Sequence, residues 1–398
     1  MARRPVLFFA LCGEGMGHAT RSWPVIRHFS ERYEVHVFAG GRVHEYLVSR
    51  VEHLHWIQTL ALVYRDNAVD VGASVRTNFS HLPGLVWSVS KFASLAVALR
   101  PHVLVTDFEA LSTYASIPLR LKTVAFDNQH ILRRALVRYP PRYERDARAA
   151  ARAIFWTIPF ANRHVISTFF EAPITRPHTR IVPPIVRPEV LELTPTTSDT
   201  VLVYQTSDSN RRLVPVLNQV DAQFVIYGLH REEVIGNCTL RTFSEVRFLE
   251  DLARARSVIT NGGHTLITEA LALGKPILCE PVVGQFEQVL NALLIDELGY
   301  GQLVECLTPE AVRDFLQLED RFRRTIQERY PPADNATALR GLEEAILELS
   351  PLLREVMAPA RSEALEQGEV KPLLITHHQS DIERPEFGRD GDAGGSMP

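Results

Sequence analysis

The sequence has few cysteines and very little lysine. Its four cysteines are scattered without a Cys-x-x-Cys pair, so neither a zinc knuckle nor a disulfide framework is indicated. Of 43 basic residues only 4 are lysine, and the net charge of −4 is too small to attract nucleic acid or a membrane by bulk charge. We therefore expect a protein of the reducing cytoplasm that does not bind nucleic acid.

Long apolar runs are also missing from the sequence. No stretch approaches the ~18 apolar residues that are needed to span a bilayer. Residues 1–15 resemble a signal peptide, because Arg3 and Arg4 precede an apolar run, but no small-x-small cleavage site follows that run. We therefore interpret the run as a buried strand.

The length of the chain predicts two domains. A chain of 398 residues exceeds the roughly 250 to 300 residues at which a single core stops growing. A Pro- and Thr-rich stretch near the middle predicts a linker, which we place at residues 191–200 between halves at 1–190 and 201–355. Apolar periodicity then disappears, and we expect a disordered tail at residues 359–398.

Short apolar runs alternate with helical patterns, which is typical of doubly wound α/β domains. Residues 6–11 predict a buried strand and residues 19–29 a helix. Further strands are predicted in "YEVHVFAGG", "RPHVLVTDFEA" and "LKTVAFDNQH", and then in "TVLVYQTSD", "AQFVIYGLH", "RSVITNGG" and "KPILCEP". The predicted fold class is α/β, with two Rossmann-like doubly wound domains that face each other across a cleft.

A glycine-rich turn that ends in His18 follows the first strand. It is no Walker A loop, since no Gly-Lys-Ser/Thr follows, and the last glycine of the dinucleotide fingerprint falls on His18, so nicotinamide binding is not expected. His18 lies in the first turn of a helix, where the positive helix end disfavours the imidazolium. A neutral imidazole can act as a general base, and Asp107, at the end of a strand on the same side, is our candidate for its partner.

Both residues have a simpler interpretation. His18 could merely cap the turn. Asp107 could be the N-cap of a helix that begins near Glu109.

A second glycine motif follows a strand in the other half. Asn261-Gly262-Gly263 opens a helix whose free amides and positive dipole end can bind an anion. Thr265 and Glu269 are four residues apart and share a face of that helix, so a hydroxyl can lie near a phosphate and a carboxylate near a ribose. The next strand leads to polar groups that can hold sugar hydroxyls, namely Gln285, Glu287 and Gln288. The simpler alternative is an ordinary helix with an exposed acid.

These motifs together resemble the GT-B glycosyltransferases of families 1 and 28. The group includes the transferase that makes peptidoglycan lipid intermediates from UDP-N-acetylglucosamine, and the UDP-glucuronosyltransferases. "VTDFEA", "FDNQH" and "GQFEQVLNA" look closer still to a less characterised prokaryotic branch related to family 28. The residues that carry the wider resemblance are Gly15, Met16, Gly17 and His18, then Asn261, Gly262, Gly263, Glu269, Gly274, Lys275, Pro276, Pro281, Glu287 and Gln288.

The resemblance implies a role for each matching residue. It makes the N-terminal half the acceptor-binding domain, with His18 as acceptor base and Asp107 as its partner. It makes the C-terminal half the nucleotide-sugar domain, with Glu269 on the ribose and the Leu249 backbone on the base. The diphosphate would lie on Gly262, Gly263 and Thr265, and the donor sugar on Gln285, Glu287 and Gln288. Asn261 stands where plant family-1 enzymes have a diphosphate-binding histidine and His264 follows three residues later, so either could touch the phosphate.

The expected activity is transfer of a sugar from a nucleotide-diphosphate donor, a UDP-sugar, to a hydroxyl acceptor with inversion. His18 would take the hydroxyl proton, and the helix that begins at Gly263 would stabilise the leaving charge. No Asp-x-Asp motif occurs in the two predicted domains, so we expect neither a metal nor another cofactor. A nucleotide-sugar 2-epimerase of the same fold and a non-catalytic GT-B partner subunit are the alternatives.

Residues 131–170 suggest a lipid or cell-envelope acceptor. They carry eight arginines against Glu144 and Asp146, and the interleaved aromatic residues include Phe155, Trp156, Phe160, Phe169 and Phe170. Such a surface can lie on an anionic membrane and present a lipid, which would make a cytoplasmic protein peripheral to the inner face of the plasma membrane. The alternative is a solvated arginine-rich helix.

Overall fold

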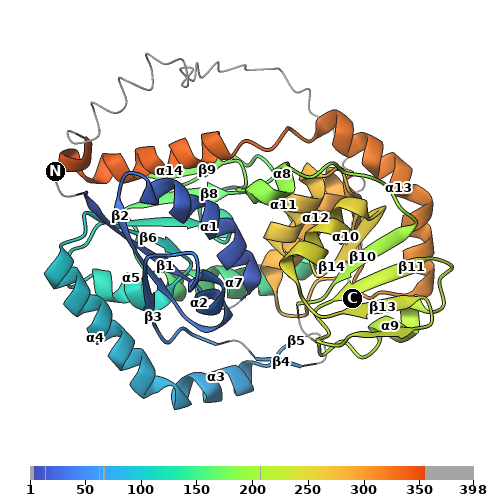
Figure 1. The fold of residues 1–398 in the computed structure, drawn as a ribbon, viewed down its shortest axis with the longest axis horizontal. Helices are drawn as coiled ribbons and strands as arrows, with labels where there is room; N and C mark the ends of the chain where they lie inside the picture. The colour runs from blue at the N-terminus through green and yellow to red at the C-terminus, as the bar shows by residue number, and fades with distance from the viewer. Residues whose placement is uncertain (1–3, 14, 62, 66–67, 207, 355–398) are drawn as a thin grey trace, which may run out of the picture. The chain divides into compact units, whose positions relative to one another are not determined.

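The structure is a computed structural model that describes residues 4–354 except residues 14, 62, 66, 67 and 207. The tail predicted at residues 359–398 lies outside the described residues. Within them, the chain forms two seven-stranded sheets flanked by helices (Figure 1). This arrangement agrees with the two doubly wound α/β halves predicted from the sequence.

The first sheet is parallel throughout and has the strand order β3-β2-β1-β6-β7-β8-β9. The order reverses between β1 and β6, which makes the carboxyl ends of these two strands the expected ligand crevice. Its strands are β1 (Val6–Leu11), β2 (Glu34–Ala39), β3 (His53–Trp56), β6 (Val103–Asp107), β7 (Thr123–Asp127), β8 (Arg163–Ser167) and β9 (Thr179–Val182).

Helices cover both faces of this sheet, so β1 is buried along its whole length. Alternate side chains of β1, from Val6 to Ala10, pack with Phe38 and Phe92 in one core cluster. In Figure 1, α1 (Met16–Ser30) lies on one face, and α4 (Leu82–Leu99) and α5 (Ala110–Ser116) lie on the other. The remaining elements of this half are α2 (Gly41–Leu47), α3 (Val71–Ser80), α6 (Ile131–Arg134), a 3-10 helix (Pro141–Tyr143), α7 (Glu144–Thr157), and the hairpin β4 (Tyr64–Arg65) and β5 (Ala68–Val69).

The second sheet has the order β12-β13-β11-β10-β14-β15-β16 and is parallel except for the β12–β13 pair. Its order reverses between β10 and β14, so its crevice lies where the second glycine motif leaves β14. Its strands are β10 (Thr200–Tyr204), β11 (Gln223–Tyr227), β12 (Glu233–Ile235), β13 (Cys238–Arg241), β14 (Ser257–Thr260), β15 (Ile277–Cys279) and β16 (Gly301–Leu303). Its helices are α8 (Pro188–Leu191), α9 (Leu213–Leu217), α10 (Glu245–Arg254), α11 (His264–Ala272), α12 (Phe286–Glu297) and α13 (Pro309–Arg329).

The last described helix, α14 (Asn335–Leu349), returns to the first sheet and packs against β7, β8 and β9 (Figure 1). Gly341 lies so close to β9 that an added Cβ would come within 2.6 Å of Val182. Arg32 pairs with Glu343 at 2.8 Å. The predicted domain at residues 201–355 therefore includes a helix that packs on the other half.

One helix corrects the expectation that no segment is apolar enough to span a membrane. By length and composition α4 meets that requirement, although only 17% of it is buried in the structure. Lys91 and three serines interrupt its sequence. A search for continuous apolar runs therefore missed a helix that is apolar on average.

Candidate active site

The two helix N-termini that carry the glycine motifs meet at the crevice. The Thr265 hydroxyl at the start of α11 donates to the Gly17 carbonyl at the start of α1, at 3.1 Å. A Cβ on Gly17 would come within 2.9 Å of that hydroxyl oxygen, so this approach requires glycine. The N-cap of α1, Gly15, has φ 85°, a left-handed conformation that favours glycine. The positive ends of two helices thus converge, which favours an anion between them.

The structure brings together His18 and Asp107, the two predicted catalytic residues. The His18 Nδ1 lies 2.9 Å from Oδ1 of Asp107. Asp107 is the last residue of β6 and is paired in register with Leu11 of β1, so both residues lie at one edge of the sheet. Glu109, rather than Asp107, caps α5 through two backbone amides. The carboxylate is fully buried, whereas the His18 side chain is 15% exposed and can meet a substrate.

Arg21 and Ser22 complete the surroundings of the Asp107 carboxylate. Arg21 donates from Nε to Oδ2 at 3.1 Å and from its second terminal nitrogen to Oδ1, and the Ser22 hydroxyl donates to Oδ2 at 2.8 Å. Burial alone would raise the pKa of Asp107, but the charge of Arg21 and the hydrogen bonds from His18 and Arg21 outweigh it. The pKa of this carboxyl is therefore well below its usual range, and Asp107 stays an anion.

The position of Arg21 also affects the tautomer of His18. The Arg21 terminal nitrogen that bonds Asp107 lies 3.1 Å from the His18 Nδ1. A guanidinium can only donate, so its hydrogen bond to Nδ1 requires Nδ1 without a proton. The hydrogen bond from Nδ1–H to Asp107 requires the proton there, so the two hydrogen bonds exclude each other. Only the tautomer in which Nδ1–H donates to Asp107 leaves a lone pair on Nε2. That tautomer is the one that can act as a base.

A chain of hydrogen bonds joins this pair to the other half of the molecule. Arg21 donates to Oδ1 of Asn128 at 2.9 Å, and Nδ2 of Asn128 donates to Oε1 of Glu287 at 2.9 Å. Glu287 lies in the first turn of α12 and was predicted to contact the donor sugar. Asn128 therefore links the proposed base to the proposed sugar site.

The side chain of Asn261 is fully engaged with neighbouring loops. Its carbonyl oxygen accepts from the Thr206 amide at 2.8 Å, and its Nδ2 donates to the Glu280 carbonyl at 2.9 Å. The next residue, Gly262, has φ 90°, and a Cβ there would come within 2.8 Å of the Gln288 carbonyl. Asn261 thus holds the backbone of the glycine turn, while Gly263 faces open space.

His264 is buried in the first turn of α11, and neither of its ring nitrogens has a hydrogen-bond partner among the described residues. Burial, followed by the charge of Arg21, lowers the pKa of His264 to about 3, although the charge of Asp107 acts in the opposite direction. The imidazole is therefore neutral near pH 7. Of the two residues considered for the diphosphate, Asn261 has its amide occupied and His264 has both nitrogens unoccupied.

Glu269, the predicted ribose ligand, forms a buried bidentate ion pair. Arg187 donates from Nε to Oε1 at 2.5 Å and from a terminal nitrogen to Oε2 at 2.7 Å. Arg187 also contacts Glu245 on α10 at 3.1 Å, and its own pKa is raised because these two carboxylates outweigh its burial. The ion pair fixes the direction of the Glu269 carboxylate, which is 2% exposed.

The other predicted donor residues lie on two helices. Gln285 is the N-cap residue of α12, and the Gln288 side-chain carbonyl accepts from the Val282 amide at 2.9 Å. Gln288 therefore shapes the turn after β15. Leu249 lies inside α10 with its side chain in the core, and the predicted contact of its backbone with the base stays a prediction.

Three residues of the site were missed from the sequence. Arg21 lies one helical turn after His18, so the spacing of three residues was an available signal. Asn128 lies within "FDNQH", the polar end of a predicted strand. Arg187 lies just before the predicted linker, 82 residues before Glu269, and no local pattern pairs the two.

Comparisons with known proteins concern the family and the fold of the chain. A family model described as glycosyl transferase family 1 matches residues 6–318. An uncharacterized glycosyltransferase of Methanosarcina acetivorans is 22% identical over 352 residues, which cover 80% of this chain and 91% of that protein.

Solved structures show the same fold. UGT2 of Phytolacca americana, in complex with UDP-2fluoro-glucose and pterostilbene, has a TM-score of 0.63 at 13% identity and covers 87% of this chain and 100% of its own. MurG of Acinetobacter baumannii has a TM-score of 0.54 at 15% identity and covers 87% of this chain and 99% of its own. The predicted GT-B fold class, with two Rossmann-like halves, is confirmed.

Proposed function

Because the chain belongs to glycosyl transferase family 1 and is a glycosyltransferase, we propose that it transfers a sugar from a nucleotide-diphosphate donor to an acceptor hydroxyl. One observation carries the proposal. A histidine that is bonded to a buried aspartate stands beside the N-terminus of a second helix, and the first amides of a helix have no partner within the helix. The first group can take a proton and the second can accept a leaving anion.

The proposed mechanism is an inverting displacement. Nε2 of His18 removes the acceptor proton while the acceptor oxygen attacks the anomeric carbon, and the bond from that carbon to the diphosphate oxygen breaks. Asp107 stabilises the imidazolium that forms. The amides at the start of α11 and the neutral ring of His264 donate to the departing diphosphate, so we propose that the reaction requires no metal.

We propose a UDP-sugar as the donor, with its ribose hydroxyls on Glu269. The ion pair with Arg187 supports this role because it holds the carboxylate in one orientation before the ligand arrives. Glu287 and Gln285 lie at the start of α12, where they can hold sugar hydroxyls.

We also propose a lipid acceptor and a membrane contact, on a larger surface than residues 131–170 alone. Of the aromatic residues in that segment, Phe155, Trp156 and Phe160 are exposed, while Phe169 is buried. A second apolar surface lies on α3 and α4, and its exposed residues are Val75, Phe79, Leu82, Val86, Trp87 and Val97.

The two apolar surfaces adjoin α5. Helix α4 packs against α5, and Tyr114 of α5 bonds the Trp156 carbonyl of α7 at 2.7 Å. From residue 71 to residue 100 the chain carries three basic residues and no acid, which suits an anionic lipid surface. We name the exposed residues of α3 and α4 the lipid-facing patch.

The activity can be tested by UDP release. The purified chain is incubated with UDP-glucose, UDP-N-acetylglucosamine or UDP-glucuronate, and with polyprenol, diacylglycerol or phenolic acceptors. Acceptor-dependent UDP release that disappears in His18→Ala supports the transferase. Conversion of the donor without an acceptor would indicate the 2-epimerase instead, and no turnover with any acceptor would favour the non-catalytic subunit.

The membrane contact can be tested by sedimentation with vesicles. We expect binding to phosphatidylglycerol at low salt and release as salt rises, because screening shortens the reach of surface charge. Phe79→Ser/Trp87→Ser should bind less, while Val234→Ser, an exposed apolar residue of the other half, should bind like the parent. Equal recovery with neutral vesicles, or no effect of the double substitution, would contradict the proposal.

A further inference from the structure

Four side chains of metal-ligand type lie on one face of the β2–β3 edge. Glu34 and His36 are two residues apart on β2, and His53 and His55 are two residues apart on β3, so each pair points to a single face. His36 and His53 are register partners in this parallel pair, which puts both pairs on the same face. These side chains belong to the edge strand and its neighbour, and the proposed transfer reaction does not use them.

Three of the four form a compact group. The His36 Nε2 lies 3.1 Å from Oε1 of Glu34. One potential ligand atom each from Glu34, His36 and His53 lies within 4.8 Å of the other two. The His36 and His53 rings are stacked with centroids 4.6 Å apart. Because a metal lies in the plane of each imidazole that binds it, the His53 ring must turn, and its side chain is 38% exposed and free to do so.

His55 occupies the position of a supporting residue. Its Nε2 lies 3.0 Å from Nδ1 of His36, the nitrogen that points away from Glu34. A histidine that binds a metal through one nitrogen usually donates from the other to a fixed acceptor. The rings of Phe8 and Phe38 pack against His36 and His55, at 5.8 Å and 5.0 Å, and complete an apolar wall.

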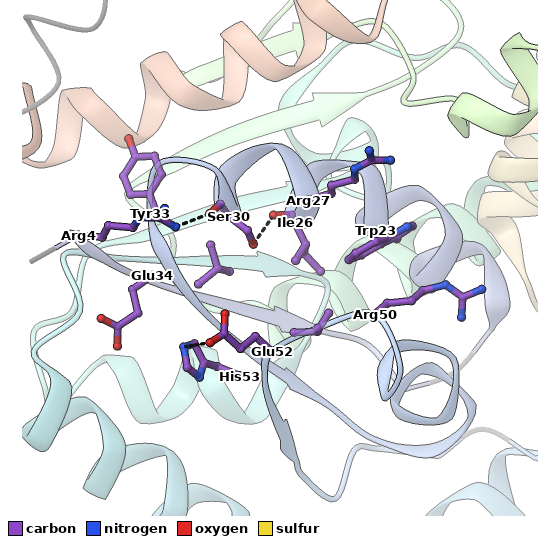
Figure 2. Close-up of a pocket in the computed structure, with 12 residues that line it drawn as sticks. Arg4, Trp23, Ile26, Arg27, Ser30, Tyr33, Glu34, Arg50, Glu52 and His53 are labelled. Carbon is purple, nitrogen blue, oxygen red and sulfur yellow. Dashed lines mark hydrogen bonds and ion pairs between the residues drawn. The ribbon is translucent and has the colours of Figure 1, made fainter.

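A solvent-accessible cavity of about 430 Å³ leads to the group (Figure 2). Glu34 and His53 line it, and the Glu52 carboxylate lies 3.9 Å from the His53 Nε2. Arg4, Arg27 and Arg50 also line it; Arg4 donates to the Ser30 carbonyl, and Arg50 pairs with Glu245. The cavity lies at the amino ends of β2 and β3, whereas His18 and Asp107 lie at the carboxyl edge of the sheet.

We propose that Glu34, His36 and His53 form a Zn²⁺ site that fastens the edge strand β3 to β2. Two imidazoles and one carboxylate make a donor set that suits zinc, with water in the fourth position. A metal on Nε2 of His36 requires the ring proton on Nδ1, which then donates to the His55 Nε2.

The experiment is calorimetric titration of the chelator-treated full chain with ZnCl₂, followed by thermal unfolding with and without the metal. We expect one Zn²⁺ per chain and a rise in Tm on binding. His53→Gln should abolish saturable binding and the rise in Tm. Because the His53 side chain is half-exposed, this substitution should not prevent folding. His55→Gln should weaken binding by roughly 10- to 100-fold, as a residue that orients a ligand does.

A matched control tests whether loss of any histidine weakens Zn²⁺ binding. His230 is exposed, lies in the other half of the chain and has φ 53°, which asparagine tolerates, so His230→Asn should bind Zn²⁺ like the parent chain. Binding in the parent that is equal to binding in His53→Gln would overturn the proposal. Loss of binding in His230→Asn would overturn it as well.

Discussion

The two glycine-rich helix starts are built alike and differ in what surrounds their histidines. Each follows a central strand at a crevice, each has glycine at the N-cap, and each carries a histidine in the first turn. His18 is partly exposed and bonded to the Asp107 carboxylate. His264 is buried, without a hydrogen-bond partner among the described residues, and its pKa is lowered to about 3 by burial. The proposed roles of the two histidines, a base and a neutral donor, thus differ because a carboxylate stands behind only one of them.

The largest expected effect separates the two starts by function. We expect His18→Ala to lower turnover by ~10² to 10⁴, because a general base contributes that much, while donor affinity stays nearly intact. Steady-state kinetics and calorimetric titration with UDP on the same two proteins measure both quantities. Loss of donor affinity in this variant would move His18 to the diphosphate site, and an unchanged rate would remove it from the mechanism.

For Glu269, on the donor side, we expect a loss of donor affinity. Glu269→Gln should weaken UDP binding by about 2 to 3 kcal/mol, since it removes a charged acceptor from the ribose. Glu245→Gln is the matched control, because Glu245 also pairs with Arg187 but has no proposed ligand role. UDP affinity that falls equally in both variants would mean that only the ion pairs of Arg187 matter.

The buried histidine should make stability depend on pH. The folded pKa of His264, about 3, is below its unfolded value near 6.5, so the unfolded chain binds a proton first as the pH falls. The contribution of neutral His264 to the free energy of unfolding is complete above pH 6.5 and is lost as the pH falls towards 3. At pH 5 this amounts to about 2 kcal/mol, and His264→Gln should not show it. Urea unfolding at pH 8 and pH 5 measures the difference, and parallel losses in the two proteins would contradict the assignment.

The contact between the two helix starts should have the smallest effect. Thr265→Val removes the hydroxyl that donates to the Gly17 carbonyl, and we expect a loss of about 1 kcal/mol in the free energy of unfolding. Ser90→Ala, which removes an exposed hydroxyl from α4, should change it by less than about 0.5 kcal/mol. Equal losses in the free energy of unfolding for the two variants would show that the contact between the halves does not contribute to stability.

Sequence reasoning succeeded where a local pattern had a structural consequence. Strand β1 was predicted at residues 6–11 and occupies Val6–Leu11, because a short apolar run bounded by turn residues is typical of a buried strand. The proximity of His18 and Asp107 followed from two parallel strands whose carboxyl ends share an edge. The helix after the glycine turn begins at Met16 rather than at residue 19, because Gly15 already serves as its N-cap.

What the sequence could not predict depends on contacts between distant segments. The ion pair joins Glu269 to Arg187, which precedes β10 in the sequence while Glu269 follows it. No local spacing in the sequence predicts this pair. From the sequence, Asn261 and His264 are equally suited to contact a phosphate. Only the structure shows that the Asn261 side chain already accepts a hydrogen bond from the Thr206 amide. The return of α14 to the first sheet likewise depends on tertiary packing.

The most direct test of the central claim is the pH dependence of kcat/KM in three proteins, the parent, His18→Ala and His264→Gln, with an acceptor identified by UDP release. The account predicts that the rate of the parent falls on acidification, because His18 must be neutral to accept a proton. His264→Gln should keep this acidic limb, and His18→Ala should lack it. An acidic limb that disappears in His264→Gln and persists in His18→Ala would show that the two histidines have been assigned the wrong way round.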